Sequence, residues 1–198
     1  QGGALVHLQA ADAGGLGGGL FAFDAADQSS RDDGGLVLVD SAGGRWKRIF
    51  DGPICAEWFG AAGLGDAVAA AVARSSDLML GPQTYAIAAD LELGAGRTYI
   101  FAPGAKLEVA AGRTVVIRGR VDATSAAIFA GEGRVIGIRD VVPEWWGAVG
   151  GRTGDQATAI QSALNCVAAS QASDGDVQCV RLSGDYLIGS TLNAIVSA

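Results

Sequence analysis

The chain has 198 residues, of which 49% are hydrophobic, which is enough for one large or two small packed domains. Its formal net charge of −7 argues against a nucleic-acid-binding surface, because phosphate binding requires clustered lysine and arginine side chains. The 31 glycines exceed the usual share of ~7% and show no collagen period, so they favour a β-rich chain with many tight turns.

The residue types that hold metals or cross membranes are sparse. The three cysteines, Cys55, Cys166 and Cys179, show no C-x-x-C spacing and leave one thiol unpaired in any scheme. The single histidine, His7, lacks the converging partners that a metal site requires. No run approaches the roughly 18 apolar residues of a membrane-spanning helix. The sequence therefore predicts no metal site, no cofactor and no membrane insertion.

The N-terminal third reads as an arm followed by a small β module. Residues 1–19 are mostly glycine and alanine, and we expect a Gly-rich linker or extended arm because such a run loses much backbone entropy on ordering. Residues 20–56 contain three predicted strands, with a tight turn at Ser41–Gly44 between the last two. The predicted strands are Leu20–Asp24, Leu36–Asp40 and Arg45–Phe50.

A duplicated motif organises the remainder of the chain. Residues 57–61 read E-W-F-G-A and residues 144–148 read E-W-W-G-A. A helical pattern follows each copy, Gly65-Asp66 corresponds to Gly154-Asp155, and residues 81–87 correspond to residues 182–188. We therefore expect a first motif copy with β-solenoid rungs over 57–142 and a second copy over 143–198, with each tryptophan motif marking a domain junction.

In the second copy, Asp155 or Thr158 is positioned to cap an amphipathic helix. Residues after the helix alternate between apolar and polar, which predicts short strands around a Ser183-Gly184 turn.

A shorter repeat lies between the two copies. Leu91–Phe101 aligns with Leu107–Ile117 through the pattern L-E-x-x-A-G-R-T, so the spacing from Leu91 to Leu107 is the predicted repeat interval. Short strands joined by glycine corners at a constant interval are typical of a β-solenoid, in which each rung covers the apolar edge of the one before.

These motifs together resemble a known family. E-W-W-G-A, then G-D-x-x-T-A-I-Q-x-A-L, then G-D-Y-L-I over residues 144–188 is similar to the start of the right-handed parallel β-helix of phage tailspike and tail-fibre proteins, in the pectate-lyase-like superfamily. The paired aspartates of the family pattern are missing, since residues 151–156 read G-R-T-G-D-Q. The strands before E-W-F-G-A also resemble the small β module at this place in many tailspikes. The resemblance implies a mainly β fold, with a small N-terminal β module followed by β-solenoid rungs and short amphipathic helices.

Two functions remain open. The resemblance implies a structural and assembly module of a phage tailspike in the virion tail, which attaches a receptor-binding or polysaccharide-degrading β-helix to the particle. It further implies a homotrimer, a phage tail or baseplate protein as partner, and host surface polysaccharide bound by the downstream region. The alternative is a secreted, pectate-lyase-like carbohydrate-active protein with a saccharide site. Because the chain begins at Gln1 and stops as the second copy completes, we expect it to be a piece of a longer protein.

The candidate site residues all lie in the two tryptophan motifs. Trp58, Trp145 and Trp146 are candidates for stacking on sugar rings, although aromatic side chains at such places more often seal a solenoid end or a subunit interface. Glu57 and Glu144 are the weak catalytic alternative, because glycoside hydrolysis uses two carboxylates. A residue repeated in both copies more often has a repeated structural task. We therefore predict no catalytic residue in this segment, while the resemblance implies that the parent protein is a polysaccharide depolymerase, a glycoside hydrolase or lyase.

Overall fold

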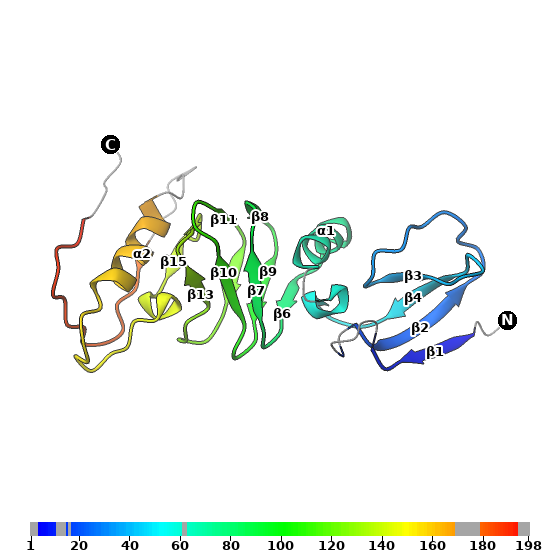
Figure 1. Ribbon diagram of the computed structural model, residues 1–198, viewed down its shortest axis with the longest axis horizontal. Helices are drawn as coiled ribbons and strands as arrows, with labels where there is room; N and C mark the ends of the chain where they lie inside the picture. The colour runs from blue at the N-terminus through cyan, green and yellow to red at the C-terminus, as the bar shows by residue number, and fades with distance from the viewer. Residues whose placement is uncertain (1–3, 11–14, 16, 61–62, 169–178, 194–198) are drawn as a thin grey trace. The chain divides into compact units, whose positions relative to one another are not determined.

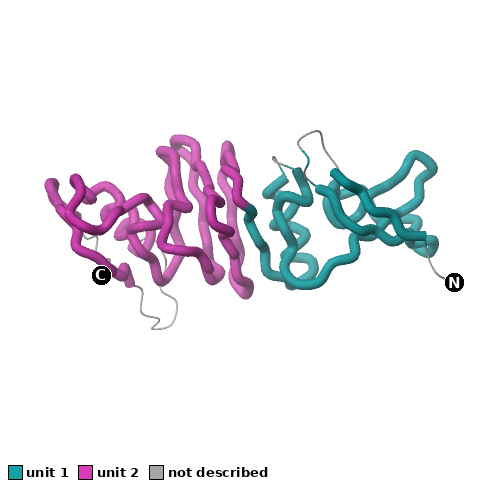
Figure 2. Tube along the Cα trace, turned by 90° about the horizontal axis from the view of Figure 1, so that it is seen from below, with its two compact units in different colours: residues 1–81 teal, residues 82–198 magenta. Residues whose placement is uncertain are grey.

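The protein is described from a computed structural model that covers residues 4–10, 15, 17–60, 63–168 and 179–193 (Figure 1). The chain divides into two compact units, residues 1–81 and residues 82–198, which are teal and magenta in Figure 2. The described part of each unit consists mainly of β-strands and carries one α-helix. The mainly β fold predicted from the sequence is therefore confirmed.

A four-stranded antiparallel sheet with strand order β1-β2-β4-β3 forms the N-terminal part of the first unit (Figure 1). Its strands are β1 (Leu5–Leu8), β2 (Gly19–Asp24), β3 (Val37–Val39) and β4 (Arg45–Ile49). The three strands predicted after residue 19 are confirmed. The turn between β3 and β4 is closed by the Gly43 amide, which donates to the Asp40 carbonyl at 2.9 Å.

Strand β1 was not predicted, because residues 1–19 were expected to form a linker or arm. Val6 lies opposite Phe21 in an antiparallel pair, so part of this segment belongs to the sheet. A short strand between glycine- and alanine-rich stretches has little preference of its own. The edge of β2 supplies the backbone hydrogen bonds that order it.

The two motif copies share one order of elements: strand, 3-10 helix, α-helix, strand. The first copy is β5 (Ile54–Cys55), η1 (Ala56–Phe59), α1 (Leu64–Arg74) and β6 (Leu78–Leu80). The second copy is β15 (Asp140–Val141), η2 (Pro143–Trp146), α2 (Ala157–Ala168) and β16 (Cys179–Val180). In both copies the first strand pairs in parallel with the last.

The two helices begin differently, and the expected match of Gly65-Asp66 with Gly154-Asp155 is wrong in structural terms. Asp155 precedes α2 and accepts a hydrogen bond from the Ala157 amide at 2.9 Å, as expected of a capping residue. Asp66 instead lies inside the first turn of α1, whose N-cap Gly63 has no side chain to bond.

The sequence boundary between the compact units follows β6, between Gly81 and Pro82, so junctions near residues 57 and 143 stay predictions.

Three rungs of a parallel β-solenoid make up the centre of the second unit (Figure 1). The first rung has β7 (Thr84–Ile87), β8 (Leu91–Leu93) and β9 (Thr98–Phe101), and the second has β10 (Lys106–Val109), β11 (Thr114–Ile117) and β12 (Arg120–Asp122). The third has β13 (Phe129–Gly131), β14 (Arg134–Ile136) and β15. Two sheets cross all three rungs, in the orders β13-β10-β7 and β14-β11-β8, and β12 pairs with β9.

The predicted rung interval, the spacing from Leu91 to Leu107, is too short and therefore wrong. Lys106 lies opposite Thr84 and Phe129 lies opposite Leu107, so one rung leads from position 84 to 106 and the next from 107 to 129. The pattern L-E-x-x-A-G-R-T aligned β8 and β9 with β10 and β11, which belong to different sheets. Both segments turn a corner at a glycine with positive φ, Gly96 at +80° and Gly112 at +73°. The short repeat therefore reflects a glycine corner that both segments share, and not the length of a rung.

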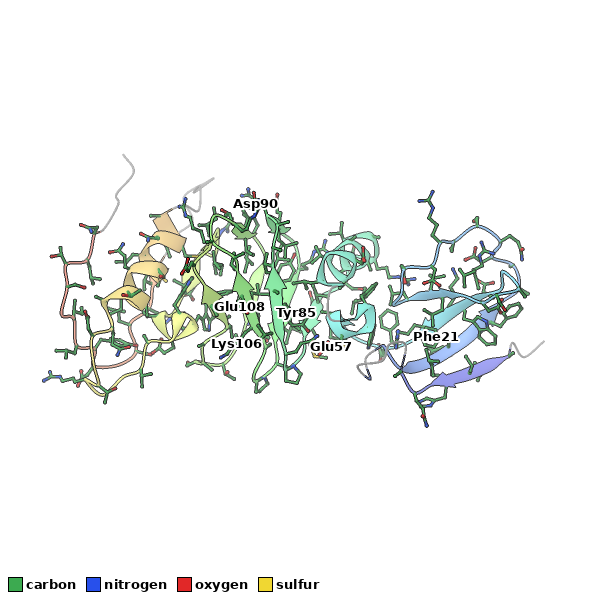
Figure 3. The ribbon with its side chains drawn as sticks, in the orientation of Figure 1. Phe21, Glu57, Tyr85, Asp90, Lys106 and Glu108 are labelled. Carbon is green, nitrogen blue, oxygen red and sulfur yellow. The ribbon has the colours of Figure 1, made fainter. Side chains whose placement is uncertain are left out.

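The solenoid interior is filled by side chains that stack from rung to rung. Tyr85, Leu107 and Phe129 lie opposite one another on successive rungs and are 1%, 0% and 4% exposed. Successive residues of a strand face opposite sides, so Lys106 and Glu108, which flank the inward-facing Leu107 in β10, are exposed (Figure 3). No described helix is both long and apolar enough for a membrane span.

Candidate functional site

Trp58, the first of the candidate tryptophans, packs inside the first unit. The guanidinium carbon of Arg48 lies 4.5 Å from the centre of the Trp58 ring. The ring also meets Phe50 in an edge contact, with centroids 5.0 Å apart and an interplanar angle of 66°. A tryptophan whose face is taken by a guanidinium has less surface free for a sugar ring, so the contacts of Trp58 are those of a packed residue.

Arg48 itself is only 8% exposed. Its Nε donates to the Gly35 carbonyl at 2.6 Å, while Nη1 and Nη2 donate to the Gly18 and Gly17 carbonyls at 2.7 and 2.6 Å. The guanidinium also lies over the fully buried Phe21 ring, 4.6 Å from its centre. We name Arg48 and these three carbonyls the arginine clamp.

The arginine clamp holds Gly17 and Gly18 of the glycine-rich segment through their carbonyls. A Cβ atom at Gly19 would lie 2.1 Å from Arg48 Nη1, so glycine leaves room for the guanidinium. Burial lowers the pKa of Arg48 to about 10, although Cys55 and Asp33 oppose the shift, and the side chain stays charged at neutral pH. Sequence reasoning missed this residue. One signal in the sequence could have found it: the alternation in R-W-K-R-I places Arg48 on the same strand face as the aromatic Trp46.

Glu57, in the first copy, is packed against the backbone that follows β6. A Cβ atom at Gly81 would lie 1.1 Å from Glu57 Oε1, so the carboxylate occupies the space that the glycine leaves. The second oxygen, Oε2, is buried and accepts no hydrogen bond from the residues described. The side chain thus connects η1 with the end of β6.

Glu144, in the second copy, makes a comparable connection. Its Oε1 accepts hydrogen bonds from the Ser183 hydroxyl at 2.8 Å and from the Tyr186 hydroxyl at 2.5 Å. Burial by itself raises the pKa of Glu144, but the bonds from Tyr186 and Ser183 outweigh it and hold this pKa below its usual value. A general acid requires a raised pKa, so the setting of Glu144 is that of an ionised carboxylate that ties η2 to the segment after β16.

Replacing Glu144 with glutamine is expected to reduce the dependence of stability on pH. The pKa of Glu144 is lower in the folded protein than its usual value of 4.5, so its contribution is complete above about pH 4.5 and is lost as the pH falls through the folded value. Urea unfolding of wild type and E144Q at pH 7 and pH 3.5 measures this difference. Glu108→Gln, at an exposed position, is the control and should keep the pH dependence of the wild type. If E144Q and the wild type depended equally on pH, the bonds of Glu144 to Ser183 and Tyr186 would not contribute to stability as described.

Trp145 and Trp146 lie next to each other in η2 but have different surroundings. Trp145 is 7% exposed, and its indole nitrogen donates to the Thr124 carbonyl at 3.2 Å. The Phe129 ring makes an edge contact with Trp145 at 6.3 Å and a tilted contact with Trp146 at 4.9 Å. Both indoles therefore pack at the third rung of the solenoid.

Two concave surfaces lie in the second unit. One has a volume of about 430 Å³ and is lined by Trp146, by Phe129 and by polar side chains of α2 such as Thr158 and Ser162. The other has a volume of about 630 Å³ and runs along the corner between β11 and β12, with Trp145 in its wall. In the part of the chain that the structure describes, no three histidine, cysteine, aspartate or glutamate side chains gather in a way that could hold a metal ion.

Comparison with known proteins finds a family model that matches the N-terminal sheet. Residues 1–51 match the family model for the phage tail protein small four-stranded beta-sheet domain. The chain is also similar to the tailspike protein of Acinetobacter baumannii phage AM24, with 18% sequence identity and a TM-score of 0.41. That similarity covers 71% of this chain and 31% of the tailspike, so the chain spans less than a third of that protein. The matched residues contain the whole β1-β2-β4-β3 sheet, so the number of strands in this sheet agrees with the description of the family model.

Proposed function

We propose that this chain is a structural and assembly module of a phage tailspike, which attaches a receptor-binding or polysaccharide-degrading β-helix to the virion tail. The observation that carries the proposal is that one chain holds a phage tail sheet domain in residues 1–51 and a parallel β-solenoid from β7 to β15. The sheet domain provides the part that belongs with the tail. The solenoid provides a scaffold on which further rungs of a receptor-binding region can be built.

An exposed apolar patch on the N-terminal sheet supports a docking role. Leu20 lies opposite Ile49, and Leu5 lies opposite Ala22, two residues along from Leu20, so the three large side chains share one face. Leu5, Leu20 and Ile49 are 62%, 39% and 48% exposed. Grouped exposed apolar side chains mark protein contacts, and we assign this patch, the sheet patch, to contact with a phage tail or baseplate protein.

The proposal includes a homotrimer, whose number of subunits comes from the resemblance to tailspikes. The second unit also exposes large apolar side chains, among them Leu182 at 55%, Leu187 at 47% and Ile188 at 46%. Contacts between subunits would cover such side chains in a stable oligomer.

The expected result is that the purified chain is a trimer by light scattering and sediments with phage particles that lack their tailspikes. The double variant Leu20→Asp/Ile49→Asp should remain folded by circular dichroism and lose at least tenfold in particle binding, because it places charges in the sheet patch. Val72→Asp, on the 50%-exposed Val72 of α1, is the matched control and should bind like wild type. A monomer at micromolar concentration, or particle binding that the double variant leaves unchanged, would contradict the proposal.

The secreted saccharide-binding alternative has one observation in its favour. Trp146 lines the 430 Å³ pocket together with Phe129 and with polar side chains of α2. Aromatic surface beside hydroxyl and amide groups is suited to a sugar ring. The reading frame of the parent protein discriminates between the two functions: a signal peptide upstream favours the alternative, and a tail-attachment domain upstream favours the tailspike module.

A further inference from the structure

The 630 Å³ groove in the second unit is strongly basic, although the chain as a whole carries a net charge of −7. Four arginines line it, and Asp140 is the one carboxylate among its lining residues. The four are Arg118, Arg120, Arg139 and Arg181, and all are exposed. We name this surface the arginine groove.

The arginines lie at successive levels of the solenoid. Arg118 and Arg120 flank the corner between β11 and β12 on the second rung, Arg139 precedes β15 on the third rung, and Arg181 follows β16, which pairs with β15. Neighbouring strands are about 4.8 Å apart, so positive charge repeats along the groove. An anion with several charged groups therefore fits the groove better than a single small ion.

The wall of the arginine groove includes an unpaired strand edge. β12 pairs with β9 on one side and is the last strand of its sheet, so among the residues described no strand covers its other side. The next rung does not close this edge, because β15 pairs with β16 instead. Arg120 and Val121 of β12 both line the groove. An open edge of backbone N–H and C=O groups is a template for an added strand.

Two corners that line the groove are glycines. Gly96 and Gly119 line the groove, and a Cβ atom at Gly119 would lie 2.5 Å from the Arg97 carbonyl oxygen, so a larger residue does not fit there.

The existing ion pairs of the groove are open to exchange. Arg118 Nε donates to Glu92 Oε1 at 2.8 Å, and Arg181 pairs with Asp140. The four side chains that form these two ion pairs are each more than half exposed, from 52% to 64%. Exposed ion pairs contribute little to stability, so a ligand carboxylate can replace Glu92 or Asp140 at small cost.

We propose that the arginine groove binds an acidic peptide segment in extended conformation, which adds as a strand to the free edge of β12 and places its carboxylates among the arginines. Main-chain hydrogen bonds to β12 supply affinity, and arginine–carboxylate bonds select acidic sequences. Asp122, two residues after Arg120 on the same side of β12, repels an acidic side chain and thereby sets the register. The proposal does not depend on the tailspike function.

Fluorescence anisotropy with the complete chain tests it. The probe is a labelled eight-residue peptide with glutamate at every second position and valine between, since alternate residues of a strand face the same way. We expect Arg120→Gln to raise Kd about threefold and Arg120→Gln/Arg139→Gln about tenfold, the size typical of exposed charge pairs. Arg113→Gln, an exposed arginine outside the groove, is the matched control and should leave Kd unchanged.

Two further probes separate the proposal from general attraction between charges. A peptide with glutamine for every glutamate should lose binding, and a peptide N-methylated at alternate amides should bind at least tenfold more weakly, because it cannot add to the strand edge. Equal binding of the methylated peptide, or equal weakening by Arg113→Gln, overturns the proposal. Binding of a glucuronic acid oligosaccharide without binding of the glutamate peptide also overturns it, and would identify the groove as a saccharide site.

Discussion

Replacement of Arg48 with alanine is expected to destabilise the first unit by about 3–5 kcal/mol. The change removes a buried side chain that lies over the rings of Phe21 and Trp58. It also leaves the carbonyls of Gly17, Gly18 and Gly35 without their donors. An unsatisfied buried acceptor costs about 1–3 kcal/mol, so the loss exceeds that of an ordinary surface substitution.

Urea unfolding followed by tryptophan fluorescence measures this loss, because Trp58 itself contacts the guanidinium. Arg48→Lys keeps the charge but cannot present three forked donors, and it should fall between wild type and Arg48→Ala. Arg31→Ala, at an exposed arginine of the same unit, should stay within about 0.5 kcal/mol of wild type. If Arg48→Lys were as stable as wild type, the arginine clamp would not be what orders the glycine segment.

Replacement of Leu107 with alanine is expected to destabilise the second unit by about 2–5 kcal/mol. Leu107 is 0% exposed and lies opposite Tyr85 on one neighbouring rung and Phe129 on the other. The alanine would leave a cavity between two aromatic side chains, and the hydrogen-bonded strands on both sides limit its collapse.

Thermal and urea unfolding of Leu107→Ala, Leu107→Met and Glu108→Ala test the inward orientation of β10. Methionine nearly conserves volume and should cost less than about 1.5 kcal/mol, while Glu108→Ala on the outer face should change stability by less than about 0.5 kcal/mol. If Glu108→Ala lost more stability than Leu107→Ala, Glu108 rather than Leu107 would face the solenoid interior, which would contradict the orientation of β10.

Local signals in the sequence determined much of the fold. Alternation and turn residues were enough for β2, β3 and β4, because a strand with one buried face and a tight turn is encoded within a few residues. The motif duplication predicted a tryptophan loop, a helix and a strand in each copy, and in the structure each loop forms a 3-10 helix. The capping role of Asp155 could also be predicted from the sequence, because its carboxylate accepts a hydrogen bond from an amide only two residues away.

Tertiary structure alone decided the features that join distant residues. The length of a rung depends on which strands pair, and the local similarity of two glycine corners suggested a shorter rung than the one that forms. Strand β1 depends on the open edge of β2, and the role of Arg48 depends on three carbonyls between 13 and 31 residues away in the chain. The four arginines of the groove are spread from 118 to 181 and become neighbours only because successive rungs stack their corners. Such contacts arise from long-range pairing, whose register no short stretch of sequence contains.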